Sequence, residues 1–349
     1  MRNITMNVKH LLLAIAALAI SLNATAQETK NEKFQAFADK YLKLSGYIQG
    51  GFEWTEAPAK DTAEATFYLK RARVSLSGNA AEEKIDYRLQ VDMAGKPKIC
   101  DLYFRYKPLN QLGMQLGQFK VPFAIENELI GPTTFEFIEY SYITYYFSRN
   151  NKTYDGIDGA TGRDIGFQLY GSFIEKEGYN IINYNVAIFN GAGINTKDNN
   201  APKDYVARLI VKPIKDLSIS GSVMHAATMT EQEDCLSSLR WSVGAWYNSS
   251  SWIARAEYAE ATFGYNKAQS CYAMAGYNFQ KPWSVVARYE FIKDVYKTLD
   301  QERITLGGVY KPYKFLRLQL NASYITNHVA PTAKAKNPLG INLMVSAIF

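Results

Sequence analysis

Arginine recurs at alternate positions in this sequence, and its side chains carry the clearest potential for chemistry. Arg71 and Arg73 stand two residues apart in FYLKRARVSLSG, and Ser75 and Ser77 continue the same alternation. Alternate residues of a β-strand lie on one face, roughly 7 Å apart, so the two guanidinium groups would point the same way. Such a pair can hold a phosphate or a carboxylate and pass it from one group to the next. The pattern therefore predicts reversible binding of oxyanions.

Further charges occupy the polar side of similar segments. Ten arginines alternate with apolar residues: Arg71, Arg73, Arg88, Arg105, Arg208, Arg240, Arg255, Arg288, Arg303 and Arg317. Six acids share these polar faces: Glu53, Asp86, Asp92, Asp101, Glu257 and Glu290. Each arginine therefore has two interpretations, a contact for anions or a pairing partner for a carboxylate. Arginines outnumber acids and the formal net charge of +6 has the same sign, so the set as a whole favours anions.

Two-residue periodicity dominates the chain from Lys43 to its end. In KIDYRLQVDM every second residue from Ile85 to Met93 is apolar and the residues between them are polar, and FLRLQLNASY repeats this arrangement. Strict alternation of this kind predicts β-strands with one apolar and one polar face. Counting such segments gives about sixteen strands between residues 42 and 349, so the fold class is all-β.

The apolar faces and the connections indicate a transmembrane antiparallel β-barrel. Aromatic residues often begin or end an apolar face, as expected where rings lie at the two membrane interfaces. A lipid-facing arginine near the midplane costs about 2–4 kcal/mol, so the arginines are placed in the lumen. Lys70 falls on the opposite face from Arg71 and is expected to reach a membrane interface. Compact turns, several with Lys-Pro, alternate with long polar loops, which is the asymmetry of an outer-membrane barrel.

The N-terminus predicts export. Residues 1–26 combine Arg2 and Lys9 with an apolar run and Ala-Thr-Ala, which indicates a signal peptide cleaved before Gln27. A membrane anchor is the alternative, but the run is about half of the ~20 residues that a spanning helix needs. Residues 27–41 are expected to form a periplasmic segment with a short helix, and residues 42–349 the barrel.

The C-terminal octet NLMVSAIF alternates up to its last residue, Phe349. It predicts the closing strand of the barrel, with Leu343 and Val345 among the residues that face lipid. A terminal aromatic residue on such a strand is similar to the signal that barrel-assembly machinery recognises. We therefore expect that machinery and outer-membrane lipids among the partners of the chain.

One connection, from Pro122 to about Gly162, is much longer than the others. A segment of this length is usually functional. Its aromatic residues need burial, and an external loop gains burial most easily by folding into the barrel. We therefore expect this third extracellular loop to be infolded and to form the constriction. The alternative is a lid that packs on neighbouring loops.

The motif GQFKVPFAIE before this loop, with FYLKRARVSLSGNAAEEKIDYRLQVD and NVAIFNGAGIN, resembles the phosphate-selective porin O and P family. The resemblance covers nearly the whole mature chain. It implies a trimeric barrel of about sixteen strands whose arginine-lined wall guides anions. Lys120 in the motif and Arg149 in the long loop are then further contacts. The expected substrate-binding residues are Arg71, Arg73, Arg88, Arg105, Lys120 and Arg149.

The resulting hypothesis is an outer-membrane porin for passive diffusion of small anions, with phosphate or polyphosphate among them. A general porin without phosphate selectivity is the first alternative, and a barrel with a plugged lumen is another. An outer-membrane enzyme is a third, but His225 and His328 lie in no catalytic motif. No cofactor, metal or nucleic-acid motif is present, and three cysteines are too few for a disulfide framework.

Overall fold

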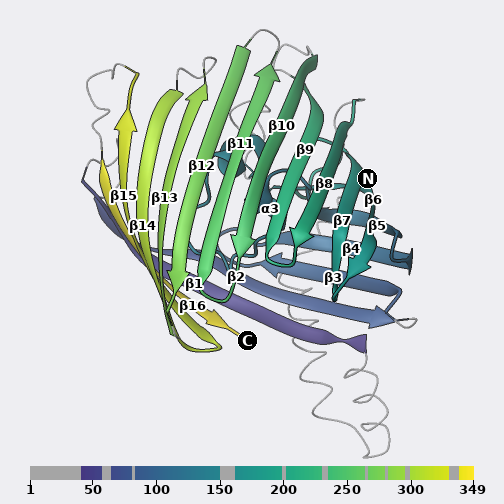
Figure 1. Cartoon of the computed structure of the whole chain (residues 1–349), viewed down its shortest axis with the longest axis horizontal. Coiled ribbons are helices and arrows are strands. Elements are labelled where there is room, and N and C mark those ends of the chain that lie inside the picture. Colours follow the sequence, from purple (N-terminus) through teal and green to yellow (C-terminus); the bar gives the residue numbers. More distant parts are fainter. Residues whose placement is uncertain are drawn as a thin grey trace, which may run out of the picture.

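The computed structural model describes residues 41–56, 64–80, 83–149, 162–198, 202–229, 235–263, 266–279, 282–294, 299–329 and 338–349. The expected signal peptide and nearly all of the segment that follows it lie outside this range. Within it, sixteen antiparallel strands close into one barrel, each hydrogen-bonded to its neighbours in chain order (Figure 1). Among the described residues, no helix has both the length and the apolar character needed to cross a membrane.

All sixteen predicted strands are present, with ends that differ by a few residues. Their bounds are β1 (Lys43–Thr55), β2 (Ala65–Ala80), β3 (Ile85–Asp92), β4 (Lys98–Leu109), β5 (Leu112–Lys120), β6 (Arg163–Lys176), β7 (Tyr179–Phe189), β8 (Asp204–Ile214), β9 (Leu217–Met229), β10 (Cys235–Asn248), β11 (Trp252–Phe263), β12 (Asn266–Asn278), β13 (Trp283–Asp294), β14 (Leu299–Tyr313), β15 (Leu316–Asn327) and β16 (Leu339–Ile348). The prediction of an all-β barrel is confirmed.

The C-terminal strand closes the barrel, as its alternation predicts. Strand β16 pairs with β1 from Tyr47 opposite Ile348 to Thr55 opposite Gly340. Beyond the strand, Phe349 still exchanges two backbone hydrogen bonds with Gly46, at 2.8 and 2.9 Å. Every strand thus has two neighbours, and no strand edge is left unpaired.

Short turns and longer connections alternate around the barrel. Pro108, Pro213 and Pro312 each lie at a register shift just before a short turn. Proline lacks an N–H donor, so it ends the regular ladder there without leaving a donor unpaired. Glu177 and Gly178, which form another short turn, have φ angles of 48° and 78°. Two successive positive φ values are typical of the two-residue turns that match strand twist.

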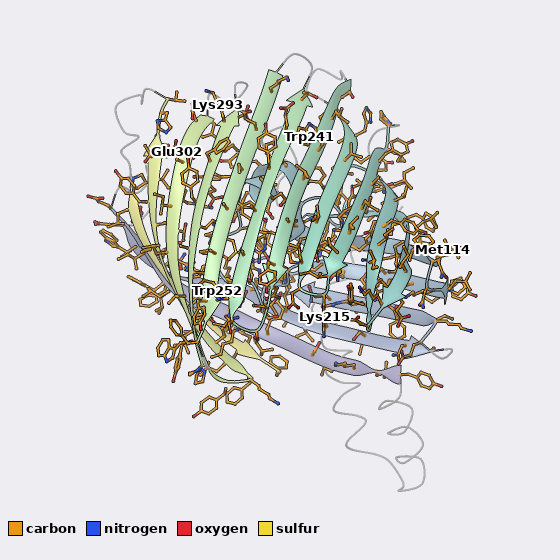
Figure 2. The ribbon with its side chains drawn as sticks, in the orientation of Figure 1. Met114, Lys215, Trp241, Trp252, Lys293 and Glu302 are labelled. Carbon is orange, nitrogen blue, oxygen red and sulfur yellow. The ribbon has the colours of Figure 1, made fainter. Side chains whose placement is uncertain are left out.

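The outer face is apolar and the inner face is polar. The outward side chains of Phe67 and Leu69 are 84% and 72% exposed, whereas the inward Arg73 and Ser75 are 4% exposed. Figure 2 shows Trp252 at the short-turn end of β11 and Trp241 farther from that end, about midway along the adjacent strand β10. An apolar outer face around a polar interior is typical of a barrel surrounded by lipid.

The prediction for Lys70 is wrong. Gln49 pairs with Arg71 and Gly50 pairs with Leu69, so Lys70 is the extra residue of a β-bulge. A bulge interrupts the alternation of faces, and Lys70 and Arg71 consequently both point inward. There Lys70 forms an ion pair with Glu139 of the long loop. A lysine expected at the membrane interface is therefore a contact between the wall and the loop.

Candidate functional site

The long connection between β5 and β6 contacts the inner wall of the barrel. It contains α3 (Ile125–Glu128) and the π-helix η1 (Ile143–Arg149), and Figure 1 shows α3 enclosed by the strands. Its hydrogen bonds reach inward side chains of strands as distant as β1 and β13. Gln49 donates to the Pro132 carbonyl at 3.2 Å, and the Tyr142 N–H donates to Glu290 at 2.7 Å. The described part of this loop, residues 121–149, therefore lies across the barrel interior.

The base of the loop is held by buried hydrogen bonds. The Val121 N–H donates to the Gly162 carbonyl at 2.9 Å, which brings the two ends of the loop together. The fully buried Asn127 amide donates to the carbonyls of both residues, at 2.9 and 3.2 Å. Gly162 has a φ of 70°, and a Cβ there would lie 2.1 Å from the Asn127 Oδ1 atom. Only glycine fits this position, because both the conformation and the space exclude a side chain.

The GQFKVPFAIE motif spans the end of β5 and the start of the loop, where the chain leaves the barrel wall. Gly117 has a φ of 129°, and a Cβ there would lie 2.2 Å from the Leu102 carbonyl oxygen. Gln118 donates to the carbonyls of Ile99 and Cys100, at 2.8 and 3.0 Å. Phe119 is 2% exposed and packs on Phe189, with ring centroids 5.1 Å apart. Most of the motif is therefore committed to holding the loop in place.

Acidic side chains anchor the start of α3. The Ile125 N–H points at the Glu257 carboxylate of β11, 3.1 Å from each oxygen. Glu126, which is fully buried, accepts a hydrogen bond from Arg255 at 3.1 Å and from the Ser141 N–H at 2.9 Å. A buried carboxylate is stable only with such partners. These contacts fix α3 against the wall.

Several of the predicted lumen arginines hold the loop backbone. Arg240 donates to the Phe147 carbonyl at 3.0 Å, Arg303 to the Tyr140 carbonyl at 2.9 Å, and Arg317 to the Thr133 carbonyl at 2.9 Å. Four loop acids also face wall cations: Glu126, Glu128, Glu136 and Glu139. Arginines of β8 and β10–β15 are therefore largely structural, in agreement with the pairing interpretation.

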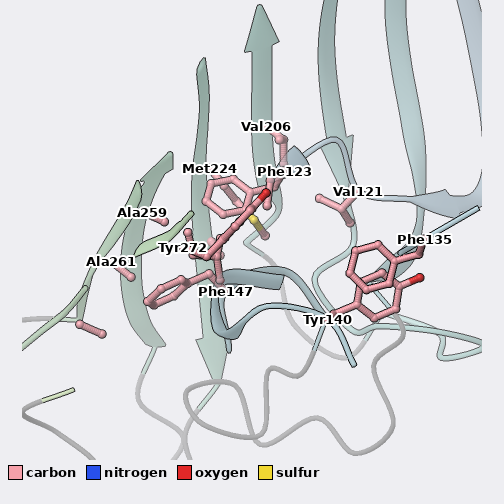
Figure 3. Close-up of a cluster of buried hydrophobic side chains, with 14 of the residues drawn as sticks. Val121, Phe123, Phe135, Tyr140, Phe147, Val206, Met224, Ala259, Ala261 and Tyr272 are labelled. Carbon is pink, nitrogen blue, oxygen red and sulfur yellow. The ribbon is translucent and has the colours of Figure 1, made fainter. Parts of the chain in front are cut away.

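An apolar cluster supports the same arrangement. Loop residues Phe123 and Phe147 are fully buried and belong to one cluster with Met224 and Tyr272 of the wall (Figure 3). Phe135 stacks on Tyr140 within the loop, with ring centroids 4.5 Å apart. Each buried aromatic side chain contributes roughly 1.5–3 kcal/mol. The loop is thus packed as a core inside the barrel.

Opposite this packed side, a basic cavity of about 370 Å³ remains between the loop edge and strands β1 to β6. Five cationic side chains line it, together with two carboxylates, Asp101 and Glu128. The cations are Arg73, Arg88, Arg105, Lys120 and Arg163. Residues Gly131 to Thr133 of the loop form its other wall. We call this space the basic cavity.

The cations of the basic cavity differ in how strongly they are paired. Arg73 is held by Asp92, with 2.8 Å between Nε and Oδ2, and Arg163 is held by Asp101 at 2.6 Å. The Arg88 Nε atom lies 3.7 Å from the same Asp101, and its side chain is 39% exposed. Arg105 contacts Asp86 at 2.7 Å and is 37% exposed. Arg88 and Arg105 therefore present the most accessible positive charge.

A second cavity, of about 530 Å³, continues this basic lining toward the short-turn rim. Arg88 and Arg105 line both cavities, together with Tyr103. Tyr41 and Lys43 at the start of the described chain border the second one. Glu83 and Asp86 also line the second cavity, so cationic and acidic side chains together extend from the basic cavity toward the short-turn rim.

The structure brings together four of the six predicted residues, Arg73, Arg88, Arg105 and Lys120. Arg71 faces the interior but donates to Gln49 at 2.8 Å, and its guanidinium lies 5.9 Å from the Tyr140 ring centre, outside this cavity. The side chain of Arg149 lies outside the described residues. Sequence reasoning missed Arg163, although this residue begins the two-faced segment RDIGFQLYG.

Glu139 shows how the loop alters the charge balance of the lumen. Burial alone would raise the pKa of this carboxyl, but Lys70, with smaller contributions from Arg303 and Arg71, holds the pKa below its usual value. Glu139 is therefore ionised near neutral pH. The count of arginines against wall acids omitted this charge and those of Glu126, Glu128 and Glu136, which neutralise part of the positive charge of the wall.

Replacing Glu257 by alanine should loosen the loop without opening the barrel. The buried Ile125 N–H would lose its acceptor, which costs about 1–3 kcal/mol. Protease cleavage between residues 124 and 149 of the folded protein should then become about tenfold faster. Glu257→Gln, which keeps an acceptor oxygen, is the matched control. Equal cleavage rates in wild type and Glu257→Ala would show that this contact does not anchor α3.

Known proteins share this architecture. A family model described as phosphate-selective porin O and P matches residues 42–346. An anion-selective porin from Comamonas acidovorans superposes with a TM-score of 0.69 at 15% identity, over 88% of this chain and 99% of that chain. The outer membrane channel DcaP of Acinetobacter baumannii gives 0.64 at 15% identity, over 88% and 97%.

The trimer form of OmpT, an outer membrane protein of Vibrio cholerae, gives a TM-score of 0.59 at 10% identity, over 88% of this chain and 99% of that chain. At these identities the structural matches establish the fold. No curated protein sequence matches the chain. In the part of the chain that the structure describes, no group of three or more His, Cys, Asp or Glu side chains could hold a metal ion.

Proposed function

Since this chain belongs to the phosphate-selective porin O and P family, it is an outer-membrane porin, and we propose that it conducts small anions through the basic cavity. The observation that carries this proposal is the lining of that cavity, five cationic side chains against two carboxylates. Fixed charge of one sign in a narrow aqueous passage raises the local concentration of the opposite ion.

Phosphate or polyphosphate is the substrate class that we infer. Arg88 and Arg105 offer planar forks that suit the oxygens of a phosphate group. Gln90 and Gln115 line the same cavity and add neutral donors. The description of the family and the anion-selective porin from Comamonas acidovorans support this inference.

The constriction is assigned to the infolded loop and the facing wall, and loop residues 128–133 form the edge that borders the basic cavity. A sixteen-stranded barrel without such a loop leaves a wide aqueous channel, so selection requires something that narrows it. The loop edge is fixed by Gln49 at Pro132 and by Arg208, which contacts Glu128 at 2.5 Å. The family and the fold point to a channel rather than an enzyme. His225 and His328 do not line the basic cavity.

Reconstitution in planar bilayers tests the function. Under a potassium chloride gradient the reversal potential should have the sign of an anion-preferring channel. Added phosphate should then reduce the chloride current with saturation, because both ions use the same cationic side chains. A cation-preferring channel at low salt would overturn the proposal. Anion preference without any effect of phosphate would support the alternative, an anion porin that does not select phosphate.

We also infer that the mature chain begins at Gln27, that the short turns face the periplasm and that three copies assemble. The resemblance to trimeric porins and the apolar outward faces of β1 to β5 support a trimer; Ile48, Phe67 and Leu102 are 49%, 84% and 51% exposed. Native mass spectrometry of the purified protein should give three chains, each lacking residues 1–26. A monomer would contradict the inferred trimer, and a chain that retains residues 1–26 would contradict the inferred cleavage before Gln27.

A further inference from the structure

A pair of adjoining cavities lies on the other side of the loop edge, against strands β10 to β15. Their volumes are about 420 and 600 Å³. Thr134, Asn278, Ser284, Lys311 and Arg317 line both of them. Cavities of this size suit a small organic ligand rather than a single ion. None of these five residues lines the basic cavity.

Two cations of these cavities have no carboxylate partner. Arg317 is 2% exposed, and its guanidinium donates to the carbonyls of Thr133 and Phe135. Its Nε atom is buried and has no hydrogen-bond partner among the described residues. In the described part of the chain, neither Arg317 nor Lys311 forms an ion pair. Two neighbouring positive charges, with Glu136 as their nearby acid, favour a further anion between them.

Neutral donors complete the polar side of the cavities. Ser284 and Asn278 both face the shared space, and the Ser284 hydroxyl donates to the Asn278 side-chain oxygen at 2.8 Å. A hydroxyl can reorient toward a ligand, and an amide supplies a further N–H. The nearest acid, Glu136, is already bound to Arg255 at 3.0 Å. The net charge of the shared lining is therefore positive.

The larger cavity also has an apolar side and an opening. Phe279, Trp283 and Leu316 line it next to the polar residues. Ser250, Pro282 and Lys314, which also border it, belong to short turns. The cavity is therefore reached from the short-turn rim, where the outward side chains of Phe279 and Trp283, which are 49% and 55% exposed, border it.

We propose that these adjoining cavities form a second anion site, which binds a phosphate or carboxylate group carried on an apolar body. The oxyanion lies between Lys311 and Arg317, and the apolar body lies along Trp283 and Leu316. A soluble aromatic phosphate and the headgroup of an anionic membrane lipid share this chemistry. The site is separate from the proposed anion passage, because the loop edge lies between them.

Calorimetric titration of the purified porin with phenyl phosphate tests the site. The background is Arg88→Gln/Arg105→Gln, which weakens binding in the basic cavity. Lys311→Gln in that background should weaken phenyl phosphate binding about tenfold, since it removes one charged donor. Lys212→Gln is the matched control, because Lys212 precedes Pro213 in the equivalent turn but lines neither cavity. It should leave the affinity unchanged.

Two results would overturn the proposal: no phenyl phosphate binding in the background variant, or the same change in Lys311→Gln and Lys212→Gln. A different result would contradict the proposed conduction of anions through the basic cavity. In that case Arg88→Gln/Arg105→Gln alone would leave the ion selectivity of the channel unaltered. Repeating the titration in nanodiscs with anionic or zwitterionic lipid distinguishes a lipid headgroup from a soluble anion as the ligand of the site. Competition by anionic lipid supports a lipid headgroup as the occupant, and equal affinity in both lipids supports a soluble anion.

Discussion

Replacing both Arg88 and Arg105 by glutamate should reverse the ion preference of this porin. The basic cavity is lined by five cations and two carboxylates, a net charge of plus three, and the double replacement makes it minus one. The side chains of these two arginines are also more exposed than those of Arg73 and Arg163. In a potassium chloride gradient the reversal potential should change sign, and phosphate should no longer reduce the current.

The control is Lys107→Glu/Lys215→Glu, which changes the net charge of the protein equally. Both lysines lie near short turns, and neither lines the basic cavity. Charges at the rim are screened within about 8 Å at physiological salt, so the control should shift the reversal potential only slightly. Equal shifts in the two double variants would show that overall charge, rather than this cavity, sets the preference.

Deleting residues 133–148 should raise the conductance several-fold. The deletion removes most of the buried aromatic side chains of the loop but no wall strand, and it leaves Asn127 and Gly162 to close the base. The barrel should remain folded, because its ladder of strands is complete without the loop. Single-channel current measures the effect, and β-sheet circular dichroism verifies the fold.

A charge-matched control separates volume from electrostatics in this experiment. Residues 133–148 contain two ionisable acids, Glu136 and Glu139, and no lysine or arginine. Glu136→Gln/Glu139→Gln removes the same charges while the loop stays in place. If the deletion and this control conduct alike, the loop does not set the narrowest cross-section. A correctly folded deletion variant with unchanged conductance would lead to the same conclusion.

The alternation of residues was sufficient to predict the barrel. A strand has a side-chain period of two, so each apolar segment specifies both its conformation and the face that it turns outward. All sixteen strands and the closing role of β16 follow from that period. Lys70 departs from this alternation, because a single bulged residue reverses it and the sequence gives no local sign of the bulge.

The role of each arginine could not be predicted from the alternation of residues. The sequence places Arg255 and Arg88 equally on inward faces, yet Arg255 binds Glu136, 119 residues away, while the side chain of Arg88 is 39% exposed. Arg303 likewise holds the Tyr140 carbonyl, 163 residues away. Alternation specifies only the face of a strand, and the partner across the lumen depends on how the long loop crosses it.

By itself, therefore, the sequence determined a closed barrel with a charged interior and a loop rich in aromatic residues. Only the tertiary structure decided where the positive charge remains available. The loop packs against β8 to β15, and its acids and carbonyls occupy the arginines there, because burying an unpaired guanidinium is costly. Arg88 of β3 and Arg105 of β4 instead lie near the wall acids Asp101 and Asp86, remain 39% and 37% exposed, and line the basic cavity.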